Sequence, residues 1–251
     1  MTTGLWLTAI LVLSIAPINR STLFTHMVER LLNYFKEYPL DFLSHLSSSL
    51  PIIVGFIRYK KLNRSERLIW LLFILYFFKD TYVLVYIFTA SKPSTFFIDN
   101  IEQVIITLFV GLIYFFSFEN SSQKRLIIVF TILCSIITIL AYNSLAASTV
   151  SLSASRIFSI TLALLYFNKI IKDMQVKVIT KHSLFWFTAA LLLYTAGTFF
   201  IMLFSEYWFK ETVSDERFDF YWNINQILFI IFCILSSYGL WMSKYKLENF
   251  I

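Results

Sequence analysis

Residues 68–90, LIWLLFILYFFKDTYVLVYIFTA, are apolar almost throughout and are long enough to cross a bilayer as one helix. Lys79 and Asp80 interrupt this run at its centre. A charged side chain at mid-bilayer costs roughly 2.5–3.5 kcal/mol on insertion scales. Neighbouring residues on a helix point about 100° apart, so these two side chains can share only one contact. We therefore expect other helices to supply partners for both charges.

The composition of the whole chain indicates an integral membrane protein. Hydrophobic residues make up 58% of the 251 residues and charged residues only 14%, whereas a typical soluble domain has about 25% charged residues. The mean hydropathy is +0.72 and the isoelectric point is near 9.2. The basic residues lie mainly in short loops between apolar segments, so they report topology and do not predict nucleic-acid binding.

Seven apolar segments predict an all-α fold, a polytopic seven-transmembrane-helix bundle that forms one domain over residues 40–251. At about 20 residues for each span, a chain of this length leaves little mass outside the membrane. The predicted spans are residues 40–57, 68–90, 96–118, 126–142, 152–171, 183–204 and 222–242.

Residues 1–39 are predicted to form an N-terminal apolar and amphipathic extension. The apolar run of residues 5–16 is too short to span comfortably, and it fits either a signal-like segment or a frayed terminal helix. Residues 21–38 carry apolar side chains on one helical face, which fits an interfacial helix or a helix that caps the bundle. Met27 is an alternative start, which would leave residues 1–26 outside the protein.

The loops predict the orientation of the bundle. Thirteen basic residues lie in one set of alternate loops and the C-terminal tail, and three lie in the other set. Because cytoplasmic loops carry an excess of Lys and Arg, the first set is assigned to the cytoplasm. This assignment places the N-terminus outside and the C-terminus in the cytoplasm.

Polar residues gather in the outer halves of the predicted spans, or near mid-depth in the case of Lys79 and Asp80. Intramembrane ionisable residues normally face the bundle interior or a water-filled cavity. We therefore predict an outward-facing polar pocket that binds a ligand. The predicted pocket residues are Asp80, Lys79, Glu102, Arg156, Tyr194, Gln226, His45 and Asn223.

Arg156 is expected within hydrogen-bond reach of Glu102 or Asp80, because each group would otherwise be unpaired in a low dielectric. Two structural alternatives to a pocket stay open. Polar residues close to a helix start can be hydrated groups at the membrane interface. Buried polar groups can also form closed contacts between helices without any ligand.

No metal, cofactor or catalytic residue is predicted. His45 with Asp41 supplies too few ligands for a zinc site, and neither G-x-S-x-G nor a glycine-rich phosphate loop occurs. An acid–base enzyme that uses Asp80 or Glu102 with His45 stays an alternative, although no spacing requires it.

Several short motifs follow one another in a fixed order along residues 40–242. They are Asp80, Asn100-x-Glu102, Arg156, Ser183-Leu-Phe185-Trp186 with Tyr194-x-x-Gly197, and Trp222-x-x-Asn225 with Gly239-Leu-Trp241. In these motifs the chain resembles a family of small seven-transmembrane-helix membrane proteins of Bacteroidota that has no assigned activity. The resemblance implies a bacterial inner membrane and genes near two-component signalling systems, and it implies no catalytic residue.

These observations together favour a membrane sensing or ligand-binding module that signals through a partner, either a membrane or a cytoplasmic protein. A partner is expected because the sequence contains no recognisable kinase or nucleotide-binding motif. The alternatives are a small transporter or channel, and an intramembrane lipid-modifying enzyme. The bilayer itself is the other expected partner.

Overall fold

The computed structural model describes residues 35–36, 38–89, 95–143, 146–173, 179–208 and 215–243. The chain forms two compact units, Met1–Pro39 and Leu40–Ile251. The apolar run and most of the amphipathic helix predicted for the N-terminal extension lie outside the described residues.

All regular structure among the described residues is helical. Seven segments are long and apolar enough to cross a membrane, which confirms the predicted all-α seven-helix bundle and defines a multi-pass membrane protein. The elements are α3 (Pro39–Ser47), α4 (Ser49–Arg58), η1 (Tyr59–Lys61), α5 (Arg64–Thr89), α6 (Phe96–Ser117), α7 (Ser121–Leu140), α8 (Thr149–Asp173), η2 (Ile179–Lys181), α9 (Ser183–Leu203), α10 (Ser205–Trp208) and α11 (Asp215–Met242).

The first span is broken at Ser48, between α3 and α4. Pro51 has no backbone N–H, so the carbonyl of Ser47 loses its usual donor in the next turn. The serine hydroxyls around the break bond back to carbonyls three residues earlier, at 2.7 Å for Ser47 and 2.6 Å for Ser48. This break separates α3, which carries Asp41 and His45, from the apolar helix that follows.

Local sequence sets the start of two other spans. Asn63 and Glu66 exchange backbone and side-chain hydrogen bonds, both 2.8 Å long, and so cap the first turn of α5. Helix α11 starts at Asp215, seven residues before the apolar boundary at residue 222 that the sequence predicted. Glu216 and Asp219 favour this early start because acidic side chains stabilise a helix N-terminus.

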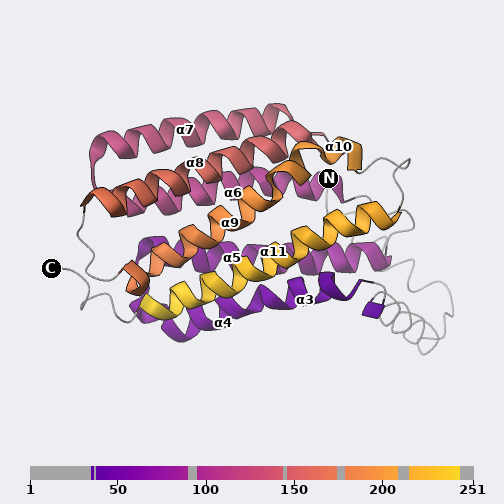
Figure 1. The fold of residues 1–251 in the computed structure, drawn as a ribbon, viewed down its shortest axis with the longest axis horizontal. Coiled ribbons are helices and arrows are strands. Elements are labelled where there is room, and N and C mark those ends of the chain that lie inside the picture. Colours follow the sequence, from indigo (N-terminus) through magenta and orange to yellow (C-terminus); the bar gives the residue numbers. More distant parts are fainter. Residues whose placement is uncertain are drawn as a thin grey trace, which may run out of the picture. The chain divides into compact units, whose positions relative to one another are not determined.

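The helices pack in a closed circuit that runs α4, α5, α6, α8, α9, α11 and back to α4. Helix α7 lies outside this circuit, where it packs on α6 and α8 (Figure 1). Figure 1 also shows that the spans run alternately along one direction, so one end of the bundle collects the starts of α6, α8 and α11. The polar residues predicted from the sequence belong to this end, which we call the polar half.

The other half of the circuit has an aromatic interior. Tyr114 is fully buried and donates to the Thr188 hydroxyl at 3.2 Å, which links α6 to α9. Phe232 of α11 lies 5.1 Å from the Phe73 ring of α5 and 5.4 Å from the Tyr194 ring of α9. These rings fill the space between α5, α9 and α11, and they form the inner boundary of the polar half.

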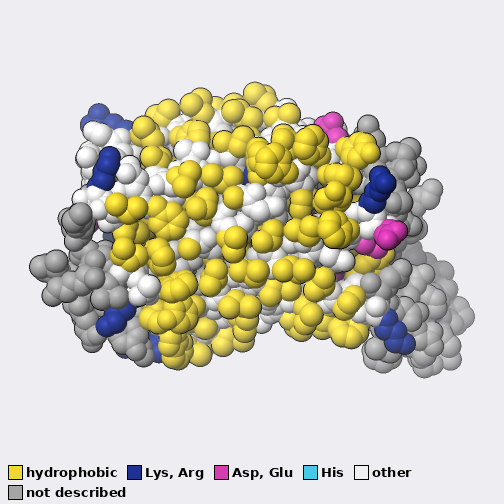
Figure 2. Space-filling view, in the orientation of Figure 1, with side chains coloured by type: hydrophobic (Ala, Val, Ile, Leu, Met, Phe, Trp, Pro, Cys, Tyr) yellow, Lys and Arg dark blue, Asp and Glu magenta, His cyan; other side chains and the backbone are white. Residues whose placement is uncertain are grey.

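On the face shown in Figure 2, hydrophobic side chains cover most of the surface between the two ends of the bundle, and the charged side chains gather mostly towards the ends. Basic side chains at the end opposite the polar half lie over aromatic rings. The Arg58 guanidinium is 4.0 Å from the Trp241 ring centre, and Arg67 is 5.2 Å from the Tyr59 ring centre. Such pairs suit a membrane interface, where an aromatic body and a charged group meet the same boundary.

Candidate functional site in the polar half

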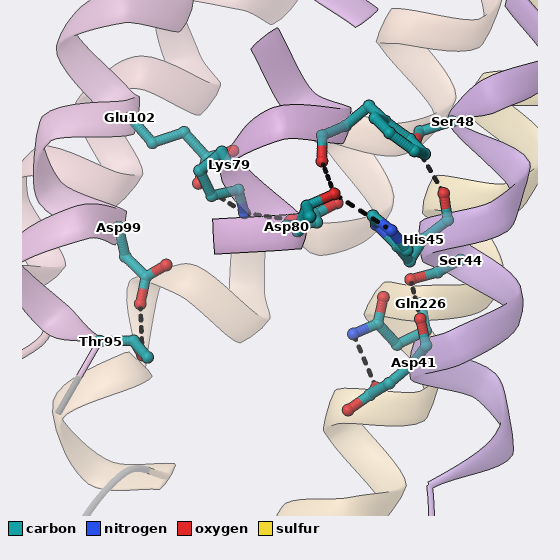
Figure 3. Close-up of polar contacts among 12 residues, drawn as sticks. Asp41, Ser44, His45, Ser48, Lys79, Asp80, Thr95, Asp99, Glu102 and Gln226 are labelled. Carbon is teal, nitrogen blue, oxygen red and sulfur yellow. Dashed lines mark hydrogen bonds and ion pairs between the residues drawn. The ribbon is translucent and has the colours of Figure 1, made fainter. Parts of the chain in front are cut away.

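An ion triad joins α5 to α6 in the polar half. The Lys79 ammonium lies 2.7 Å from the Asp80 carboxylate and 3.2 Å from the Glu102 carboxylate (Figure 3). The side chains keep exposed fractions of 26% for Lys79, 23% for Asp80 and 16% for Glu102. Glu102 is therefore the partner that another helix supplies for Lys79, whereas Asp80 pairs with Lys79 on its own helix.

His45 brings α3 to the same part of α5. Its Nε2 lies 3.4 Å from the Thr81 hydroxyl, and its ring stacks on Phe77 with centres 4.8 Å apart. Figure 3 shows the His45 ring beside Asp80, on the side of α5 away from Glu102. The structure thus brings together four of the eight predicted pocket residues, Lys79, Asp80, Glu102 and His45.

Asp41 connects α3 to α11. Its Oδ1 accepts hydrogen bonds from Trp222 Nε1 at 2.8 Å and from Gln226 Nε2 at 2.9 Å. Gln226 is buried, and Asp41 and Trp222 are half-buried. Asp41 is therefore a contact between helices, and not only a hydrated residue at the start of the first span.

Arg156 pairs differently from the prediction. It is 4% exposed, and its Nη2 donates to the Tyr194 hydroxyl at 3.1 Å while its Cζ lies 4.5 Å from the Tyr194 ring centre. Among the described residues it has no carboxylate within 4.0 Å, so the expected contact with Glu102 or Asp80 is wrong. The physical reason is that Lys79 occupies both carboxylates, while α8 packs on α9.

Tyr76 connects the ion triad to the Arg156–Tyr194 pair. It is buried on α5, one turn before Lys79, and its ring lies 5.4 Å from Phe229 of α11. Glu102, Arg156 and Lys79 are all within electrostatic reach of this side chain, as is Tyr194. Tyr76 therefore lies near enough to both groups of charges for an electrostatic interaction, and the sequence analysis did not single it out.

Asn100 has a structural role. It is 1% exposed, and its amide nitrogen donates to the carbonyls of Asn143 and Ala146, which fixes the loop before α8. Asn223 lies on the exposed surface of α11, whereas Asn225 is buried two residues later. Asn223 is thus a predicted pocket residue that the structure does not bring to the others.

Several buried polar atoms of the polar half have no hydrogen-bond partner in the structure. An unsatisfied buried polar group costs about 1–3 kcal/mol, so a set of them in one region indicates missing partners such as water or ligand atoms. Three of these atoms are serine hydroxyls near the start of α8. The sequence analysis did not predict these serines as site residues. The atoms are Gln103 Oε1, Ser151 Oγ, Ser153 Oγ, Ser155 Oγ, Arg156 Nε and Asn225 Oδ1.

The opposite half contains a second polar group that the sequence analysis assigned to a loop. Glu66 is only 2% exposed at the start of α5. Nearby, the Ser65 and Ser117 hydroxyls lie 3.1 Å apart, and Lys169 Nζ donates to the Ser117 carbonyl at 2.8 Å. The reciprocal spacing of Asn63 and Glu66 was the available sequence signal, because it is typical of a helix cap.

Neither the polar half nor the opposite end holds a cluster that suits a metal ion. Among the described residues, no group of three or more His, Cys, Asp and Glu side chains is placed to bind one. The chemistry of the polar half is therefore that of a guanidinium, an ammonium, carboxylates, amides and hydroxyls.

The fold and the site together define the class of protein as a seven-helix, multi-pass membrane protein with charged and polar side chains inside one half of the bundle. Comparison with protein families, curated proteins and solved structures finds no match. The resemblance to membrane proteins of Bacteroidota stays a prediction.

Proposed function

We propose that this protein is a membrane sensing module that binds a small ligand in the polar half of the bundle and signals through a partner protein. The observation that carries the proposal is the set of buried polar atoms without partners on α6, α8 and α11. Among the described residues the polar half holds more of these atoms than the opposite half, where Arg58 Nε, Ser236 Oγ and Ser243 Oγ also have no partner. Each such atom is costly unless water or a ligand pairs with it.

The position of the aromatic interior favours a binding site and disfavours a continuous polar path through the membrane. Four aromatic rings contact one another on the side of the charged groups that faces the opposite half. They belong to Tyr76, Tyr194, Phe229 and Phe232, and three of the pairs have ring centres 5.4–5.7 Å apart. A polar solute would meet this apolar layer after passing the charges. An apolar layer of this kind inside the bundle suits a sensor better than it suits a pore.

The Arg156–Tyr194 pair offers a route from ligand to helix packing. Tyr194 stacks on Phe232 of α11 with an interplanar angle of 12°. A ligand that changes the contact between Arg156 and Tyr194 therefore acts on the packing of α9 against α11, and can bias a two-state bundle. The distribution of basic loops supports an orientation in which this half faces outward from a bacterial inner membrane.

A thermal-unfolding screen of the purified protein in detergent tests the proposal. The screen uses small organic acids, amino acids, amines and sugars, and a compound that binds the folded state raises the midpoint temperature. Ser153→Val removes an unpartnered hydroxyl in the polar half, and Ser236→Val removes one near the other end of α11. We expect the stabilisation to weaken in the first variant only. Absence of any stabilising compound, or equal effects in both variants, would contradict the proposal.

A small transporter is a second candidate, and the buried Glu66 favours it. This carboxylate is 2% exposed at the end opposite the polar half, so ionisable groups are present on both sides of the aromatic layer. Uptake of the compound found in the screen into protein-containing liposomes separates the two functions. Accumulation that depends on Glu66 would favour transport, whereas binding without uptake favours a sensor.

A further inference from the structure

We infer that the ligand of the polar half is an oxyanion, a carboxylate or a phosphate group, and that Arg156 is its anchor. This inference rests on the proposed function and names the chemical class of the ligand. The starting observation is that Arg156 is buried at 4% exposure with Nε unpartnered. Among the described residues its one hydrogen bond goes to the Tyr194 hydroxyl, which is a neutral group.

The guanidinium has unused binding capacity. It carries five N–H donors and a permanent positive charge, so it cannot avoid burial of charge by losing a proton. No carboxylate lies within 4.0 Å of it in the described part of the chain. A buried cation in this state needs an anion or several hydrogen-bond acceptors.

The nearby carboxylates are already engaged. Asp80 and Glu102 both contact Lys79, and in the described part of the chain neither carboxylate pairs directly with the Arg156 guanidinium. A ligand with a negative group would supply the Arg156 guanidinium with a counter-charge and hydrogen-bond acceptors, and the contacts of Lys79 with Asp80 and Glu102 would stay as they are. Nε and one Nη of a guanidinium match the two oxygens of a carboxylate or phosphate in a bidentate pair.

A hydroxyl stands on the same side of α8. Ser153 precedes Arg156 by three residues, so the two side chains share a helical face. The Ser153 Oγ is buried and also has no partner. Its O–H can donate to a further ligand oxygen, which would extend the site by one turn of α8.

Two sources can supply such a group, a free small-molecule oxyanion and the phosphate of a lipid headgroup. Thermal unfolding of the full chain in neutral detergent, after lipid removal, tests the first source with sodium phosphate and sodium acetate against sodium chloride at equal ionic strength. Reconstitution with phosphatidylglycerol against a neutral glycolipid that carries no phosphate tests the second source. We expect a rise of a few degrees with at least one oxyanion source.

Variants assign the effect to Arg156. We expect Arg156→Gln to abolish the oxyanion shift, and Arg156→Lys to weaken binding about tenfold or more, because an ammonium cannot form the bidentate pair. Arg217→Gln removes an exposed arginine of α11 and should leave the shift unchanged. In chloride alone, Arg156→Gln should melt at or above the wild-type temperature, because it removes an unmatched buried charge.

The opposite results would overturn the inference. They are an absence of any oxyanion-specific shift in both the free and the lipid tests, or an equal shift in wild type and Arg156→Gln. If Arg156→Gln does not fold, the comparison of oxyanions with chloride on the wild-type protein decides whether an oxyanion binds, and Arg156→Lys tests the role of Arg156. Stabilisation by neutral or cationic compounds alone would retain the proposed function and reject the oxyanion, whereas no stabilisation by any compound would reject both.

Discussion

Lys79 of α5 and Glu102 of α6 form a contact of 3.2 Å between two neighbouring spans, while Lys79 also contacts Asp80 at 2.7 Å on its own helix. One ammonium thus serves two carboxylates. The charge pair at the centre of the apolar stretch 68–90 is stabilised because a second helix contributes an acid at the same depth.

Replacing Glu102 with Gln tests this contact. The variant keeps the shape of the side chain and removes the charge that Lys79 faces on α6. Loss of one partner of a fully buried pair costs about 3–5 kcal/mol, and partial exposure here reduces the expected loss to about 1–3 kcal/mol. Unfolding in mixed micelles measures the loss, with the exposed Glu119→Gln as control. Equal stability of the two variants would show that the ion triad does not hold α5 to α6.

The hydrogen bond from Trp222 to Asp41 predicts coupling between α3 and α11. Hydrogen bonds to charged groups contribute about 1.5–3 kcal/mol, so Asp41→Ala and Trp222→Phe should each destabilise the bundle measurably. The double variant should lose less than the sum of the two single losses, because both changes remove the same bond. Strict additivity in unfolding experiments would mean that this bond contributes nothing.

Glycine positions predict a sharp difference between two identical substitutions in helices. A Cβ at Gly239 would lie 2.8 Å from the backbone oxygen of Ser183, which cannot move without shifting α9. A Cβ at Gly197 would meet a Leu228 methyl group at 2.7 Å, and that side chain can rotate away. We expect Gly239→Ala to destabilise by about 1–3 kcal/mol. Gly197→Ala should be near neutral, because Ala favours helix by about 1 kcal/mol over Gly. The reverse order of stabilities would contradict the packing of α9 on α11.

The fold could be predicted from the sequence because its signals are local. Segment length and hydropathy depend on neighbouring residues only. The break at Ser48 was not predicted, although Pro51 is the local signal for it. The early start of α11 was missed because Glu216 and Asp219 are polar, and hydropathy alone excludes them from a span. The acids act there through the helix N-terminus, which is a backbone effect.

The site could be predicted only as far as depth. Asp80, Lys79, Glu102 and His45 share a depth and meet in the structure. The sequence does not show which helices are neighbours, because this is a tertiary property. The predicted partner of Arg156 was therefore wrong. The exposed Asn223 and the buried Asn225 are two residues apart on α11, and an apolar helix surrounded by lipid gives little periodic signal to tell such positions apart.

The orientation of the bundle is a separate prediction from the basic loops. Cysteines introduced by Asn63→Cys and Ser122→Cys should be protected from membrane-impermeant thiol reagents in intact cells, whereas Asp215→Cys should react. Residues 63 and 122 lie at the starts of α5 and α7, at one end of the bundle, and residue 215 starts α11 at the other end (Figure 1). Reaction at residue 63 in intact cells would reverse the predicted orientation without changing the fold.

Thiol reactivity inside the bundle tests the central claim most directly, namely that the polar half is a hydrated binding site. The two natural cysteines, Cys134 and Cys233, are both buried and would first be replaced by alanine. Ser153→Cys then places a thiol in the polar half, and Ser236→Cys places one near the other end of α11, at sites where both native hydroxyls are buried. The account predicts that a small water-soluble thiol reagent modifies residue 153 and not residue 236 in the folded protein, and that a stabilising ligand slows the reaction. Protection of residue 153 as complete as that of residue 236 would contradict it, and would make the polar residues structural contacts between helices.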